Sequence, residues 1–199
     1  MQRITAIQFE RMIEKNPRVF EHWDTPLEIT EYVNCEYRSI THLSEHLIFS
    51  GRNKVGDAAD FSSCHNLKIA TGTFHGGVLF DESSIEKIEN LHILQTNQNK
   101  LASSFWECKN LKVATGSYPG YVNFSESGIS KIKKLYIQTP SNDGYFAGFF
   151  DCPNLETLEG WDLSKQIIIE PQKLEAEIKR RAALQKFHKE AKAKELPFL

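Results

Sequence analysis

Three cysteines recur at a fixed interval and are the first candidates for chemistry. Cys64, Cys108 and Cys152 are spaced by one 44-residue period, and thiols can serve as metal ligands or redox centres. None of the four cysteines belongs to a Cys-x-x-Cys pair, so neither a zinc site nor a dithiol is indicated. The three share one repeat position, which Ile88 and Ile132 fill in the alternate half-repeats. We therefore expect them to be reduced thiols that pack inward.

The other residue types that could do chemistry lack the spacing that chemistry needs. His42 and His46 have i, i+4 spacing, but the zinc-protease pattern His-Glu-x-x-His is absent and the segment favours an extended coil. The glycines lack a following Gly-Lys-Ser/Thr, so a phosphate loop is not indicated. A polysaccharide-acting solenoid enzyme would use carboxylates such as Asp81 and Glu126, although loop carboxylates are usually solvated. The sequence therefore predicts no catalytic residue, no metal site, no cofactor and no enzymatic activity.

An internal repeat determines the predicted fold. The segments 61–72, 105–116 and 149–160 align without insertion, and residues 61–94 and 105–138 share 18 identities in 34 positions. Each 44-residue unit contains a weaker second copy of the apolar spacing, Ile85–Ile93 and Ile129–Ile137, which divides the unit in a 24+20 alternation. Periods of this size, with an apolar-x-x-apolar-x-x-Leu-x-Ile pattern, are typical of leucine-rich repeats.

Each Leu-x-Ile segment predicts a short strand with two inward residues, and stacked coils would pair these strands in parallel. The expected fold is a β-rich, leucine-rich-repeat-like solenoid with a 44-residue double repeat of 24+20. The Phe-x-x-Cys-x-x-Leu coils, over roughly residues 40–160, resemble the BspA-like, cysteine-containing class of bacterial leucine-rich repeats. The resemblance implies a scaffold for interactions between proteins.

Both ends of the solenoid are expected to carry helices that cap its apolar faces. Thr5 can N-cap a helix that ends before Asn16-Pro17. The region 172–195 predicts a second helix, with eight Lys or Arg against four Glu. The expected organisation is an N-terminal helical cap (1–34), the solenoid (35–170) and a basic C-terminal helix and tail (171–199).

The outward residue of each Leu-x-Ile strand defines the first predicted binding surface. This ladder mixes cations, an aromatic residue and an acid, which suits a protein partner. Its members are Lys68, His92, Lys112, Tyr136 and Glu156. A second candidate surface consists of loop residues rich in aromatics, some of which are expected to pack inward: Phe74, His75, Tyr118, Pro119, Tyr121, Tyr145 and Phe146.

Composition and charge restrict the expected function. The net charge is −2, so the whole chain is not built as a nucleic-acid or membrane binder. The N-terminal segment lacks the apolar core of a signal peptide, so a cytoplasmic location is expected. We therefore expect a non-catalytic protein-binding module, such as an intracellular inhibitor or adaptor of phage or mobile-element origin.

The alternative is a nucleic-acid-associated protein that uses its basic C-terminal helix. A helix with this charge could contact phosphates, and such binding would weaken steeply as salt rises. The residues that would carry it are Lys179, Arg180, Arg181, Lys186 and Lys189. The sequence identifies neither the partner nor the oligomeric state.

Overall fold

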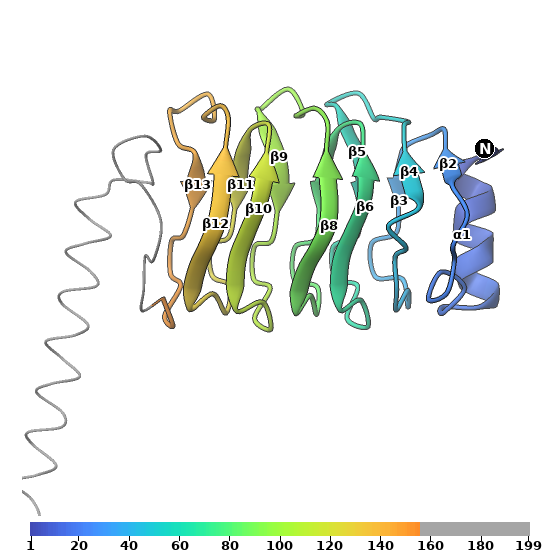
Figure 1. Cartoon of the computed structure of the whole chain (residues 1–199), viewed down its shortest axis with the longest axis horizontal. Coiled ribbons are helices and arrows are strands. Elements are labelled where there is room, and N and C mark those ends of the chain that lie inside the picture. Colours follow the sequence, from blue (N-terminus) through green and yellow to red (C-terminus); the bar gives the residue numbers. More distant parts are fainter. Residues whose placement is uncertain (156–199) are drawn as a thin grey trace, which may run out of the picture.

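The computed structural model describes residues 1–155, which form a solenoid of parallel strands in two facing layers (Figure 1). The strands of the front layer are β1 (Gln2–Ile4), β2 (Leu27–Ile29), β4 (Leu47–Phe49), β6 (Ile69–Phe74), β8 (Lys87–Ile93), β10 (Val113–Tyr118) and β12 (Lys131–Ile137). The strands of the rear layer are β3 (Val33–Asn34), β5 (Asp57–Asp60), β7 (Gly77–Leu79), β9 (Leu101–Ser104), β11 (Tyr121–Asn123) and β13 (Ala147–Gly148). Each coil from β2 onward contributes one strand to each layer.

Strand pairing divides each 44-residue repeat into a long coil and a short coil. Phe74 of β6 pairs with Phe49 of β4 across the long coil, and with Ile93 of β8 across the short coil. Ser117 of β10 pairs with Tyr136 of β12 across a short coil of the same length. The parallel solenoid expected from the repeat is confirmed, but the predicted 24+20 division is wrong, because these pairs give 25+19. The strands β10 and β12 pair with each other beside β8.

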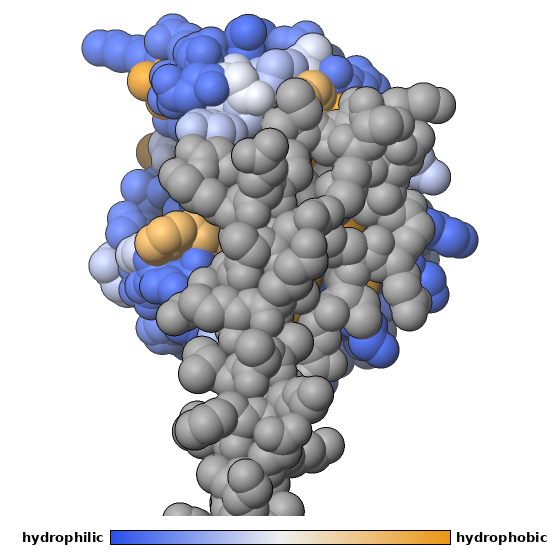
Figure 2. Space-filling view, turned by 90° about the vertical axis from the view of Figure 1, so that its left-hand side faces the viewer, coloured by the Kyte–Doolittle hydropathy of each residue, from blue (hydrophilic) through white to orange (hydrophobic). Residues whose placement is uncertain are grey.

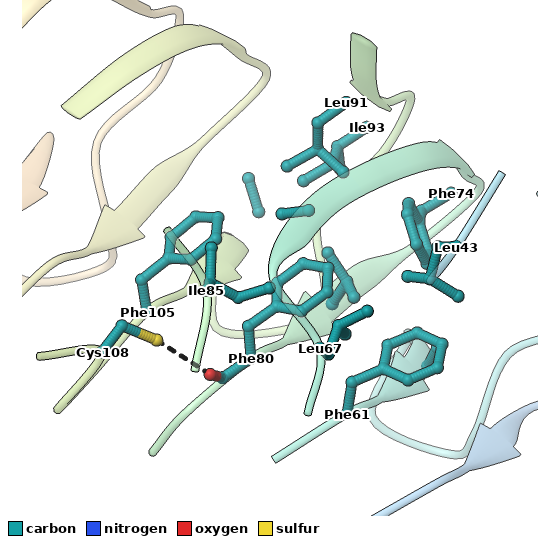
Figure 3. Packing of buried hydrophobic residues seen from close by; sticks show 14 of the residues in the cluster. Leu43, Phe61, Leu67, Phe74, Phe80, Ile85, Leu91, Ile93, Phe105 and Cys108 are labelled. Carbon is teal, nitrogen blue, oxygen red and sulfur yellow. Dashed lines mark hydrogen bonds between the residues drawn. The ribbon is translucent and has the colours of Figure 1, made fainter. Parts of the chain in front are cut away.

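A column of phenylalanine rings runs along the core. Its members are Phe61, Phe80, Phe105, Phe124 and Phe149, one from each successive coil. Neighbouring rings are stacked, with centroids 5.3 to 5.7 Å apart. Figure 3 shows three of them, Phe61, Phe80 and Phe105. Stacking of flat apolar rings adds to the free energy that their burial contributes. The column therefore fixes how successive coils lie on one another.

Cysteine and serine alternate at the next inward position of the coils. Cys108 Sγ donates to the carbonyl oxygen of Phe80 at 3.0 Å (Figure 3), and Ser83 Oγ donates to the same oxygen. The same pattern recurs with Cys152 and Ser127. All four cysteines are buried and free, as expected for packed thiols. The expectation that alternate half-repeats fill this slot with Ile88 and Ile132 is wrong, because serine fills it.

The front strands of the 44-residue repeat shift register at a glycine, and the extra residue of this bulge lies in the partner strand, β8 or β12. Gly72 and Gly116 have φ angles of 107° and 120°, and the register shifts next to each of them. Glycine adopts positive φ without the clash that a side chain would cause. Two residues of β6 therefore lie opposite three of β8, and the same holds for β10 and β12. Phe74 follows Ala70 and Gly72 at two-residue steps, so it points into the core, and Tyr118 does the same in β10.

The N-terminal helix α1 (Ala6–Lys15) packs on the first coil (Figure 1). Thr5 and Gln8 form a capping box, so the predicted helix start is confirmed. Phe9 packs against Phe20 and Phe49, with ring centroids 4.9 and 5.5 Å apart. Within residues 1–34, β1, β2 and β3 extend both layers, so this segment is more than a helical cap.

In residues 1–155, no helix is long and apolar enough to cross a membrane. The predicted C-terminal helix lies outside the described residues. The same holds for the end of the predicted solenoid, 156–170.

Candidate interaction surface

The outer face of the front layer carries a row of side chains at matched register. The pairing of Ile48 with Thr73, and of Thr73 with His92, places these three residues in line on β4, β6 and β8. Ser117 and Tyr136 are paired on β10 and β12. His92, Ser117 and Tyr136 are exposed, and Tyr136 keeps 61% of its surface accessible. His92 and Tyr136 therefore point outward, as the sequence predicted.

The other members of the predicted ladder do not join this row. Lys68 and Lys112 precede the first residues of β6 and β10, at the opposite end of the strands from Thr73 and Ser117. The extended chain from Lys68 to Thr73 spans roughly 16 Å. The backbone carbonyls of the two lysines accept hydrogen bonds from residues 86–87 and 130–131 of the next coil. The predicted single ladder is thus two separate rows, and Glu156 lies outside the described residues.

A group of five exposed lysines, here called the lysine cluster, occupies the turn before β10 and the outer side of β12. Its members are Lys109, Lys112, Lys131, Lys133 and Lys134. Lys131 is the register partner of Val113, the residue that follows Lys112. The inward side chains between these lysines, Ile132 and Leu135, are buried and fix the outward direction of the others.

The lysine cluster has no internal charge compensation from the described part of the chain. No carboxylate within residues 1–155 forms an ion pair with any of its members. Lys109 Nζ donates to the backbone carbonyl of Glu126, and Lys112 Nζ donates to that of Lys109 at 3.1 Å. The described side chains visible at this end of the solenoid are mainly hydrophilic (Figure 2). Among residues 1–155, the cluster therefore carries positive charge that no carboxylate pairs with.

The sequence interpretation predicted only Lys112 of the lysine cluster and missed the other four members. Three of them, Lys131, Lys133 and Lys134, lie in the pattern Lys-Ile-Lys-Lys-Leu, in which the apolar residues face inward. Their lack of acidic partners could not be read from the sequence, because the pairing depends on which coils are neighbours.

The second predicted surface is buried in part, while Tyr121, Tyr145 and Phe146 are partly exposed. Phe74 and Tyr118 are buried, with exposed fractions of 0% and 1%. They occupy equivalent inward positions at the ends of β6 and β10 and belong to the core. The sequence interpretation placed both residues in loops, but they belong to strands, and alternation along each strand points them inward.

The cysteines and carboxylates that were considered for chemistry are held in structural roles. Burial raises the pKa of the Cys64 and Cys108 thiols to about 12, which disfavours the reactive thiolate. Burial also raises the pKa of Asp81, which accepts a hydrogen bond from the Trp106 amide at 3.0 Å. Glu126 accepts from the indole of Trp106 at 3.1 Å. Among residues 1–155, no three His, Cys, Asp or Glu side chains gather in a way that could hold a metal ion.

Fold and surface together define a parallel, two-layered β-solenoid with an exposed and partly basic front face. Comparison with protein families, with curated proteins and with solved structures finds no match. The resemblance to BspA-like repeats therefore rests on the repeat pattern of the sequence alone.

Proposed function

We propose that this chain is a non-catalytic protein-binding module, an adaptor or inhibitor built on a leucine-rich-repeat-like scaffold of the BspA-like type. The parallel coils and the phenylalanine column support this view of the scaffold. Solenoids of this kind use extended, rigid faces to bind other macromolecules.

The observation that carries the proposal is the row His92, Ser117 and Tyr136 on the front face. Tyr136, and Leu94 two residues after His92, keep 61% and 53% of their surfaces exposed, although most apolar side chains of the described chain are buried. Large exposed side chains on a preorganised strand lose little entropy on binding and are the residue types enriched at protein interfaces. The binding surface would extend over the outer faces of β8, β10 and β12.

The first test is affinity capture from the host cell with the full tagged chain, treated with nuclease. We expect one stoichiometric protein in the wild-type capture, and its loss when His92→Ala and Tyr136→Ala are combined. The matched control is Tyr37→Asn, which removes a 72% exposed tyrosine that follows β3 of the rear layer and has positive φ. Retention of the same protein by the double variant, or its loss in the control, would refute a front-face interface.

Nucleic-acid binding through Lys179, Arg180, Arg181, Lys186 and Lys189 is the competing proposal, and these residues lie outside the described part of the chain. Nuclease treatment distinguishes the protein-binding proposal from the nucleic-acid-binding proposal. Prey that disappears on nuclease treatment would support the basic C-terminal segment and contradict the protein-binding proposal.

A further inference from the structure

We infer that the lysine cluster is the specificity-determining part of the interface and binds an acidic segment of a protein partner. This inference rests on the proposed function, because it names the chemistry of the partner that the front face would take. The inference is based on a difference in surface charge between two 44-residue repeats that have the same architecture.

The two repeats agree in their interior and differ in surface charge. Residues 61–94 and 105–138 are identical at 18 of 34 positions, and the shared residues include the phenylalanine and cysteine of the core columns. With histidine neutral, the first segment has two lysines and four acids, a net charge of −2. The second has five lysines and two acids, a net charge of +3. The divergence is therefore a change of charge on an unchanged scaffold.

Two of the three acids lost from the second repeat, Glu86 and Glu89, pair with lysine in the first, and the third is Asp81. Lys68 Nζ lies 2.9 Å from Glu86 Oε1, and Lys87 Nζ lies 3.8 Å from Glu89 Oε1. The residues equivalent to Glu86 and Glu89, one 44-residue repeat later, are Ser130 and Lys133.

Lys112 and Lys131, the equivalents of Lys68 and Lys87, thereby lose their acidic partners. Asn90 is replaced in the same way by Lys134, and both adopt positive φ, 48° and 51°. Adjacent like charges on one strand repel, so the substitution costs stability unless an anion compensates it.

The extent of the cluster favours an acidic protein segment over a long polyanion. The cluster spans two coils, roughly 10 Å across the strands. Glu86 and Glu89, on β8 and the turn before it, bound the positive surface on one side. Two further acids, Glu107 and Glu126, lie in turns of the coils that carry the lysine cluster. A long nucleic acid crossing the face would meet these carboxylates, whereas a short acidic segment contacts the lysines alone. Tyr136, at the far end of β12, supplies an apolar contact beside the charges.

The test exchanges the charge pattern of one repeat for that of the other. A variant of the full chain with Ser130→Glu, Lys133→Glu and Lys134→Asn places on β12 the residues that positions 86, 89 and 90 already carry. Because the first repeat folds with these residues and the exchange removes like-charge repulsion, the unfolding midpoint should equal or exceed that of the wild type. The control, Lys54→Glu with Lys100→Glu, makes the same change in net charge at exposed sites outside the cluster.

Binding is measured by fluorescence anisotropy at low salt with two labelled probes, a synthetic peptide of alternating glutamate and serine and a single-stranded oligothymidylate. We expect the wild type to bind the peptide, with affinity that falls as salt rises, and the exchange variant to bind it roughly thirtyfold more weakly. The control should bind like the wild type. Absence of peptide binding, equal binding by the exchange variant, or cluster-dependent binding of the oligonucleotide alone would overturn the inference.

Affinity capture with both variants distinguishes failure of this inference from failure of the proposed function. Loss of that partner in both the His92/Tyr136 double variant and the exchange variant supports both proposals. Loss in the double variant with retention in the exchange variant leaves the proposed function standing and overturns the acidic segment. Retention in both variants overturns the proposed function itself.

Discussion

Replacing Phe105 by alanine is expected to lower the free energy of unfolding by about 3–5 kcal/mol. Phe105 is fully buried and stacks between Phe80 and Phe124, with both centroid distances at 5.3 Å. Truncation removes the apolar burial of the ring and leaves a cavity between two coils. Adjacent rings belong to successive coils, so they cannot close the gap without moving the strands. Each neighbour therefore also loses its stacking contact.

Chemical denaturation followed by circular dichroism measures this effect. The matched control is Phe150→Ala, one residue beyond the buried Phe149, because Phe150 is 68% exposed. It should change stability by no more than about 0.5 kcal/mol. A cost for Phe105→Ala below about 1 kcal/mol, or equal costs at both positions, would contradict the phenylalanine column as the element that joins the coils.

Gly76→Ala is expected to destabilise the chain by about 3 kcal/mol, because two coils approach there without room for a side chain. A Cβ at position 76 would lie 2.2 Å from the carbonyl oxygen of Gly56. Gly120, at the equivalent position of the next repeat, shows the same restriction, since its Cβ would lie 2.5 Å from the carbonyl oxygen of Lys100. Side chains of Arg52 and Thr96 also crowd these positions, but the two carbonyl oxygens belong to the backbone, so the coils themselves would have to separate.

Gly144→Ala distinguishes this steric cost from the ordinary cost of replacing a glycine. Gly144 has a φ of 88°, but a Cβ there would meet no atom within 4 Å. Its replacement should cost about 1 kcal/mol, which comes from backbone strain alone. Thermal and chemical unfolding of both variants check the difference. Equal destabilisation at positions 76 and 144 would show that the spacing of the coils is not the constraint.

The long repeat and the N-terminal helix could be predicted from the sequence because both depend on local patterns. The 44-residue repeat preserves identical residues at identical positions without insertion. The helix is marked by Thr5 and Gln8, which cap it within one turn. The prediction that the cysteines are buried and free also follows from the repeat, because residues at one position of a solenoid share one environment.

The division of the repeat could not be predicted from apolar spacing alone. Apolar residues recur at nearly every third position, so an alignment of Leu91 with Leu67 looks as good as the observed pairing of Leu91 with Gly72. Only glycine marks that pairing, and it has no apolar side chain to match. The phenylalanine column was the signal that would have given the correct register. Its members are separated along the chain by alternating intervals of 19 and 25 residues, the same division as in the strand pairing.

The incorrect 24+20 division also made the predicted binding surface partly wrong. Aligning the wrong residues put Lys68 and Lys112 in one row with His92 and Tyr136, although the two lysines precede the strands. The outward direction of His92 and Tyr136 was correct because it requires only alternation along one strand. The lysine cluster depends on contacts between coils, which no local pattern reveals.

Site-specific photo-crosslinking tests the central claim most directly, namely that the outer face of β8, β10 and β12 binds a protein partner. Benzoylphenylalanine would replace Ser117, which is exposed at the centre of this face, and in a second variant Phe150, which follows β13 of the rear layer. After irradiation in the host cell, we predict one protein adduct from position 117 and none from position 150. Adducts from position 150 with none from position 117 would contradict the front-face interface.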